Sequence, residues 1–194
     1  MKKIILIAAT VASLSVLFAF KSSESANWSV DSAHTKVGFS ATHLMVSDVE
    51  GYFKKVTATI KTSNVDFSDS VAEMTAQVNS VFTDNEQRDA HLQSPDFFDA
   101  AKFPTITFKS TSFKKSTGNN YTVTGNLTIH GVTKPVTLNA IARVAENPMS
   151  KKTTAGFKIT GKINRKDFGI GASMPSTMVS EDIDLIINAE FIKE

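Results

Sequence analysis

The sequence predicts an all-β fold in which antiparallel strands are joined by hairpins and interrupted by one short helical insert. Three observations support this prediction. About eight segments alternate apolar and polar residues with a period of two, turn residues separate several of these segments, and one stretch shows helix-capping chemistry. Apolar residues occupy a single face of each segment, which is typical of antiparallel sheets. The even hairpin spacing favours an up-and-down barrel or a sandwich.

The predicted strands follow one another along the chain from residue 36 onward. Threonine and β-branched residues dominate them, as is usual on pleated surfaces. Gly118-Asn119-Asn120 and His130-Gly131 supply turn chemistry for hairpins in the second half. The apolar stripes are, in chain order, Val37, Phe39, Ala41 and His43; Val56, Ala58 and Ile60; Met74, Ala76 and Val78; Ile106 and Phe108; Tyr121, Val123, Leu127 and Ile129; Val136, Leu138, Ala140, Ala142 and Val144; Phe157, Ile159 and Ile163; and Ile183, Leu185, Ile187, Ala189 and Phe191.

One stretch breaks the strand pattern and predicts the helical insert. Residues 83–86 have the sequence of a capping box with Thr83 as N-cap, and the helix would run to about Leu92. Ser94-Pro95 predicts a second N-cap with proline at the first helical position. We expect this second turn to cover one end of a barrel. Because adjacent helical residues point about 100° apart, we expect only one of Phe97 and Phe98 to face inward, and we choose Phe98.

The N-terminal segment, residues 1–25, predicts a cleaved secretory signal peptide, which leaves one domain over residues 26–194. Lys2 and Lys3 precede an apolar run over residues 4–20, and small residues follow. We expect the mature N-terminus between Phe20 and Trp28. The alternative is an uncleaved anchor, although the run is shorter than the roughly 18 apolar residues that a spanning helix needs.

Composition excludes several classes of function. The 194-residue chain has a formal net charge of +2, and removal of residues 1–25 leaves a formally neutral domain. A neutral domain lacks the basic surface that nucleic-acid binding needs, so we expect no nucleic-acid partner. The chain has no cysteine, which excludes disulfides, thiolate metal sites and cysteine nucleophiles.

The search for catalytic or metal-binding motifs predicts neither. The four histidines, His34, His43, His91 and His130, form no H-x-H or H-E-x-x-H pair, so we expect no metal site. His43 lies on an apolar strand face, either as a hydrogen-bonded core residue or as a contact for a ligand head group. The carboxylates between Asp84 and Asp96 fit a solvated helical face, and acid–base chemistry is the alternative.

Apolar aromatic residues are abundant, since twelve of the fourteen phenylalanines follow residue 25. They indicate either a barrel filled by its own side chains or a lumen wide enough for a long apolar ligand, and an eight-stranded barrel accommodates either arrangement.

The chain also resembles a known family over nearly its whole length after residue 25. The matching blocks are WSVDSAH at 28–34, VGFSATHLMV at 37–46, GYF at 51–53, NEQRDAHLQSPDFFD at 85–99, FPTITFKS at 103–110, GNLTIHGVTKPV at 125–136 and GKINRKDFGI at 161–170. These blocks are similar to those of the YceI-like family of exported lipocalin-like proteins. The resemblance implies an extended eight-stranded antiparallel barrel, with a polyisoprenoid or similar lipid inside, in the bacterial periplasm. Family members often carry a tryptophan soon after the Asp-Phe-Gly block, where this chain has Ile170-Gly171-Ala172.

The resemblance and the apolar content together predict a periplasmic lipid carrier that acts in transport, storage or stress response. Its partner would be a long-chain apolar lipid such as an isoprenoid or a polyisoprenoid quinone, and no other cofactor is expected. Transient membrane contact and a homodimer stay open. The alternatives are an enzyme acting on a lipid or quinone and a closed-core structural module. The expected lumen and mouth residues are Phe39, Ala41, His43, Phe53, Phe98, Ile106, Phe108, Phe157, Ile159, Phe168 and Met174.

Overall fold

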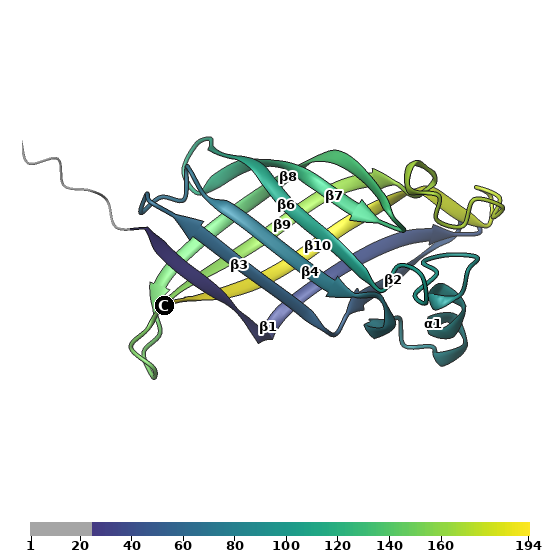
Figure 1. Ribbon diagram of the computed structural model, residues 1–194, viewed down its shortest axis with the longest axis horizontal. Coiled ribbons are helices and arrows are strands. Elements are labelled where there is room, and N and C mark those ends of the chain that lie inside the picture. Colours follow the sequence, from purple (N-terminus) through teal and green to yellow (C-terminus); the bar gives the residue numbers. More distant parts are fainter. Residues whose placement is uncertain (1–24) are drawn as a thin grey trace, which may run out of the picture.

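The computed structural model describes residues 25–194, and the predicted signal peptide lies outside the described residues except for Ser25. The described chain forms a barrel with one helix at one end (Figure 1). The strands are β1 (Ala26–His43), β2 (Ser47–Phe53), β3 (Val56–Thr62), β4 (Val71–Gln77), β5 (Val81–Phe82), β6 (Thr105–Lys115), β7 (Asn120–Ile129), β8 (Val132–Glu146), β9 (Thr153–Asn164) and β10 (Val179–Lys193). The helix α1 spans Glu86–Gln93, and two short 3₁₀ turns, η1 (Val78–Ser80) and η2 (Arg165–Phe168), complete the structure. Among residues 25–194, no helix has the length and apolarity to cross a bilayer.

The strands close into an antiparallel barrel. Hydrogen-bonded neighbours follow the order β10-β9-β8-β7-β6-β4-β3-β1, and β1 pairs again with β10. The predicted eight-stranded all-β barrel is therefore confirmed, and the sandwich is excluded. β2 and β5 are additional strands that extend the wall beside the second half of β1.

Strand β1 pairs with two different strands along one of its edges. Its first residues, Ala26 to Ser29, pair with β3, and its last seven, from Val37, pair with β2. A bulge between Asp31 and Lys36 separates the two parts in the pairing with β10. The sequence analysis did not predict β2, because Gly51 and three charged or polar residues weaken its alternation.

One end of the barrel, which we call the plugged end, is closed by the loop between β3 and β4. Phe67 of this loop is 2% exposed. Its ring lies 5.2 Å from that of Trp28 and 5.3 Å from that of Phe157, measured between centroids. The Tyr121 hydroxyl donates a hydrogen bond of 2.7 Å to the carbonyl of Asp66. Phe67 therefore acts as a stopper that the wall holds in place.

The opposite end, which we call the helical end, carries α1 and the turns that follow it (Figure 1). The predicted capping box is wrong. Asn85 is the N-cap, and its side chain accepts a hydrogen bond of 2.9 Å from the Arg88 amide. Asp84 adopts a left-handed conformation with φ 58°, which displaces Thr83 from the cap position. The Thr83 hydroxyl instead donates to the Asp89 carboxylate at 2.6 Å.

The predicted second helical turn is also absent, since residues 95–98 form hydrogen-bonded turns that fold back toward α1. The Phe97 amide donates to the Ser94 carbonyl at 3.1 Å, and the Phe98 amide donates to the Leu92 carbonyl at 3.0 Å. Both phenylalanines are buried in the apolar cluster of the helical end. The expectation that only one of them faces inward is therefore wrong, because it assumed helical spacing.

The hairpin turns agree with the sequence. His130 and Gly131 connect β7 to β8 with φ values of 52° and 73°, the pair of positive values that a type I′ turn requires. Gly118, with φ 62°, lies in the turn between β6 and β7.

The stopper gives a first prediction. Phe67→Ala should lower the free energy of unfolding by about 3 to 5 kcal/mol, because it leaves a cavity against Trp28 and Phe157. Val65 in the same loop is fully exposed, so Val65→Ala should change stability by no more than about 0.5 kcal/mol. Urea unfolding of both variants measures the difference. Equal effects at the two positions would contradict the stopper role.

Candidate ligand-binding cavity

The barrel encloses an elongated cavity with a volume of about 200 Å³. Its wall is almost entirely apolar and includes side chains from every strand of the closed barrel. At the plugged end the cavity reaches Phe113, Phe157 and Phe191, and at the helical end it reaches Phe97 and Phe98. The cavity therefore runs along the barrel between two packed ends.

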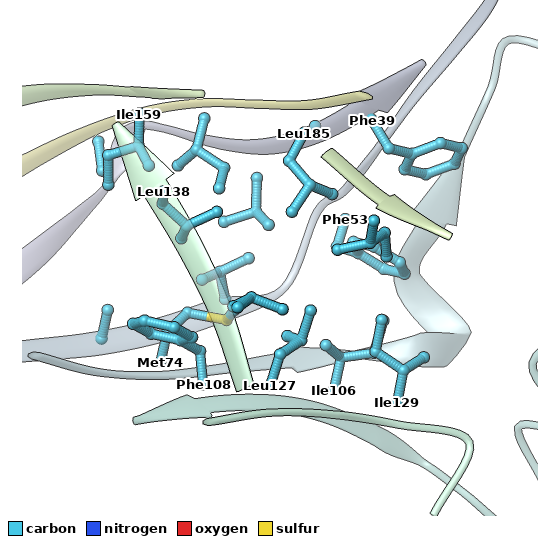
Figure 2. Close-up of a pocket in the computed structure, with 18 of the residues that line it drawn as sticks. Phe39, Phe53, Met74, Ile106, Phe108, Leu127, Ile129, Leu138, Ile159 and Leu185 are labelled. Atoms are coloured by element: carbon cyan, nitrogen blue, oxygen red, sulfur yellow. The ribbon is translucent and has the colours of Figure 1, made fainter. Parts of the chain in front are cut away.

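The side chains that line the middle of the cavity face one another across it (Figure 2). Met74, Phe108 and Leu127 come from β4, β6 and β7 on one side. Ile159 and Leu185 come from β9 and β10 on the other. This arrangement follows from period-two alternation, which points every second side chain of each strand inward.

Glycines on the inner face leave room for large side chains to lie against the wall. A Cβ atom on Gly51 would lie 2.5 Å from the Phe39 ring, and one on Gly125 would lie 2.4 Å from the Phe108 ring. A Cβ atom on Gly161 would lie 2.4 Å from Leu138. Each of these side chains therefore occupies space over a glycine, and the lumen between them stays open.

Most of the predicted site residues line this one cavity, and their contact with a ligand stays a prediction. The lining residues among them are Phe39, Ala41, Phe53, Phe98, Ile106, Phe108, Phe157 and Ile159. Phe168 and Met174 do not line it. Phe168 is 2% exposed and lies in the apolar cluster of the helical end, and Met174 packs against that cluster.

His43 is the clearest error among the predicted lumen residues. It is exposed at the end of β1 and does not line the cavity. β1 pairs with β2 in regular register up to His43, which lies opposite Ser47, so the alternation itself continues. His43 lies outside the cavity because it is the last residue of β1 and borders the exposed turn at Leu44 and Met45.

The cavity has further lining residues that the sequence analysis placed on apolar stripes without choosing them for the site. They include Val37, Met74, Leu127, Leu138, Ile163, Ile183 and Leu185. The signal that could have found them was the same alternation. Phe97, which we did not expect to face inward, also lines the cavity.

A buried arginine organises the helical end and was not found from the sequence. Arg165 of η2 is 2% exposed, and its guanidinium donates to five backbone carbonyls: those of Ser180, Ile170, Gly171, Met174 and Val179. Desolvation lowers the pKa of Arg165, and the charge of Glu181 opposes this effect. Because arginine stays protonated in proteins, a fixed charge fastens residues 170–180 to the barrel.

The carboxylates considered for acid–base chemistry lie outside the cavity wall. Asp84 and Glu86 are exposed, Asp89 bonds to Thr83, and Asp96 lies 3.4 Å from His91. No ionisable group of this segment therefore faces the space in which an apolar substrate would lie.

A second polar cluster lies at the β1 bulge. His34 Nδ1 is 2.9 Å from Asp31 Oδ2 and 4.0 Å from Glu190 Oε2. The hydrogen bond between the His34 ring and the Asp31 carboxylate raises the pKa of His34 and lowers the pKa of Asp31. These side chains do not line the cavity.

Fold and cavity together define a closed β-barrel with an elongated apolar interior. The chain belongs to the YceI family, because the family model described as "YceI-like domain" matches residues 28–191.

Relatives of known sequence or structure agree with this assignment. Protein YceI of Salmonella newport (strain SL254) is 40% identical over 93% of this chain and 94% of its own length. The crystal structure of Burkholderia cenocepacia BcnA superimposes with a TM-score of 0.74 at 29% identity, covering 83% of this chain and 98% of that one. A polyisoprenoid binding domain from Saccharophagus degradans, implicated in plant cell wall breakdown, has the same fold, with a TM-score of 0.62 at 15% identity over 86% of this chain and 98% of that one.

The arginine gives a second prediction. Arg165→Met should lower the free energy of unfolding by about 3 kcal/mol or more, because it leaves buried carbonyls without a donor. The matched control is Lys166→Met. Lys166 is adjacent, and its partly exposed ion pair with Glu181 is worth about 0 to 1 kcal/mol. Denaturant unfolding compares the two variants, and a loss at Arg165 no larger than at Lys166 would refute the fastening role.

Proposed function

We propose that this protein is an exported carrier that binds an isoprenoid-type or similar long-chain apolar lipid inside its barrel. The observation that carries the proposal is the shape and chemistry of the cavity, which is elongated, apolar and enclosed by the wall. The basic and apolar N-terminal segment supports a periplasmic location. The likeness to a polyisoprenoid binding domain of Saccharophagus degradans supports an isoprenoid ligand.

The energetics of apolar burial support a chain-like ligand. Burial of one CH₂ group contributes roughly 0.8 kcal/mol, so each five-carbon isoprene unit contributes about 3 to 4 kcal/mol before ordering costs. Several units in line would match a cavity that extends from Phe157 to Phe98. A compact ligand would leave one part of such a cavity empty.

The two ends of the barrel favour one orientation of the lipid. The plugged end is closed by Phe67 against Trp28 and Phe157. The helical end is covered by α1 and the segments around Phe98 and Ile170. We therefore place the tail of the lipid toward Phe157 and its head group toward the helical end.

We prefer a carrier that binds its ligand without reacting with it over an enzyme that acts on a lipid or quinone. Catalysis needs a reacting group within hydrogen-bond reach of the substrate, and the carboxylates of residues 84–96 lie outside the cavity wall. A closed-core structural module is also less favoured, because inner glycines keep the middle of the lumen open.

The carrier function predicts that protein purified from cells contains lipid. Mass spectrometry of an organic extract should show one long-chain apolar lipid in near-stoichiometric amount. Because a ligand that binds only the folded state stabilises it, protein stripped of lipid should melt at a lower temperature, and added geranylgeraniol should restore the melting temperature. An empty extract together with no response to geranylgeraniol would refute the carrier. A straight-chain alcohol of similar length separates isoprenoid preference from general apolar binding.

A glycine pair on β9 tests whether lumen width controls binding. Gly161→Ala should push Leu138 into the lumen, because the new Cβ atom would lie 2.4 Å from the Leu138 Cδ2 atom. We expect about tenfold weaker binding of geranylgeraniol, the effect of roughly one methylene in an apolar pocket. Gly156→Ala is the control, since among the described residues beyond its chain neighbours no atom would lie within 4 Å of the added Cβ atom. Fluorescence displacement titration measures both, and equal affinities would contradict a lipid in the lumen.

A further inference from the structure

The turn between β1 and β2 presents apolar side chains to solvent. Leu44 is 49% exposed, Met45 73% and Val46 84%. Met178, which is 44% exposed, lies beside them, since the Leu44 amide donates a hydrogen bond of 3.0 Å to its carbonyl. We call these four residues the apolar tip.

The backbone of this turn is unfavourable for the residues that occupy it. The Val46 amide closes the turn on the His43 carbonyl at 3.0 Å. The two residues between them, Leu44 and Met45, have φ values of 51° and 58°. Positive φ at both central positions favours Asn-Gly, because bulky residues are strained there. Folding alone therefore does not explain why two large apolar side chains occupy the turn.

The turn between β1 and β2, which carries most of the apolar tip, lies at the helical end (Figure 1). Ala41 and Val179 both line the cavity. Leu44 follows Ala41 by three residues, and Met178 immediately precedes Val179. The apolar tip therefore lies close along the chain to the lumen wall, separated from it on β1 by Thr42 and His43, at the end where the carrier function places the head group.

The size and charge of the apolar tip favour a bilayer over a protein partner. Four aliphatic side chains offer far less than the roughly 800 Å² that each partner buries in a stable protein interface. The apolar tip itself carries no charged residue, and the domain is formally neutral after residue 25. Shallow insertion of apolar side chains into the acyl boundary requires no matching surface.

We propose that the apolar tip inserts into a lipid bilayer and holds the helical end of the barrel against the membrane. This inference deepens the proposed carrier function and rests on it for its purpose, because a lipid could then pass between bilayer and lumen with little exposure to water.

Sedimentation with phosphatidylcholine vesicles tests the proposal. The variant Leu44→Asn/Met45→Gly removes the two largest side chains of the turn and installs the residues that the turn geometry favours. It should melt at or above the temperature of the wild type and bind vesicles about tenfold or more weaker. A gain of stability with a loss of binding cannot result from misfolding. Val46→Thr, with nearly the same shape, should weaken binding by a smaller factor.

The matched control is Met149→Asn. Met149 is 90% exposed in the turn between β8 and β9, at the plugged end, and its replacement should leave vesicle binding unchanged. Three results would overturn the proposal: no binding by the wild type, equal binding by the Leu44/Met45 variant, or a dimer in sedimentation velocity that this variant abolishes. Binding only to phosphatidylglycerol vesicles, lost in high salt, would also overturn it. An organic extract of the same preparations separates the two proposals, because a lipid-filled barrel without vesicle binding refutes only the docking.

Discussion

The pairing of β1 with β10 is the constraint on which the rest of the structure depends. Without it the sheet would have two open edges and no interior. β1 must also change neighbours from β3 to β2 along its length, and the bulge between Asp31 and Lys36 permits this change. Side chains accept hydrogen bonds from backbone amides at the bulge. The Asp31 carboxylate accepts from the Ala33 amide at 3.0 Å, and the Thr35 hydroxyl accepts from the Glu190 amide at 3.1 Å. Closure is therefore stabilised by polar contacts at the longest interruption of the β1–β10 pairing on β1.

Once the barrel is closed, its strand number fixes how much space remains. Eight strands leave an interior that side chains can just fill or that holds one small ligand. Here inner glycines decide between these outcomes, since Phe39, Phe108 and Leu138 each occupy space over a glycine. The lumen is consequently open along its middle and closed by aromatic residues at both ends. The packed aromatic ends of the barrel therefore contribute to fold stability, and the middle of the same wall leaves space for a ligand.

Alternation in the sequence was sufficient to predict at least part of each of the eight strands of the closed barrel, their inner faces and most of the cavity wall, because burial on one face imposes a period of two. It failed where a strand ends and where backbone geometry changes locally. His43 is the last residue of β1 and lies beyond the lumen wall, and the left-handed Asp84 moved the helix cap to Asn85. Arg165 was missed for another reason: its partners are backbone carbonyls, which leave no signal in the sequence.

Two segments cover the helical end, residues 170–180 and residues 94–103, and different interactions hold each of them in place. Residues 170–180 are fastened by the buried guanidinium of Arg165. Their displacement would leave the buried charge and five carbonyl groups without hydrogen-bond partners. The backbone hydrogen bonds of residues 94–103 run mainly within that segment and to the end of α1, so they can move with it. Its contact with the lumen consists of the Phe97 and Phe98 rings. Displacement of this segment therefore costs chiefly apolar contacts, and an entering lipid chain replaces contacts of the same kind.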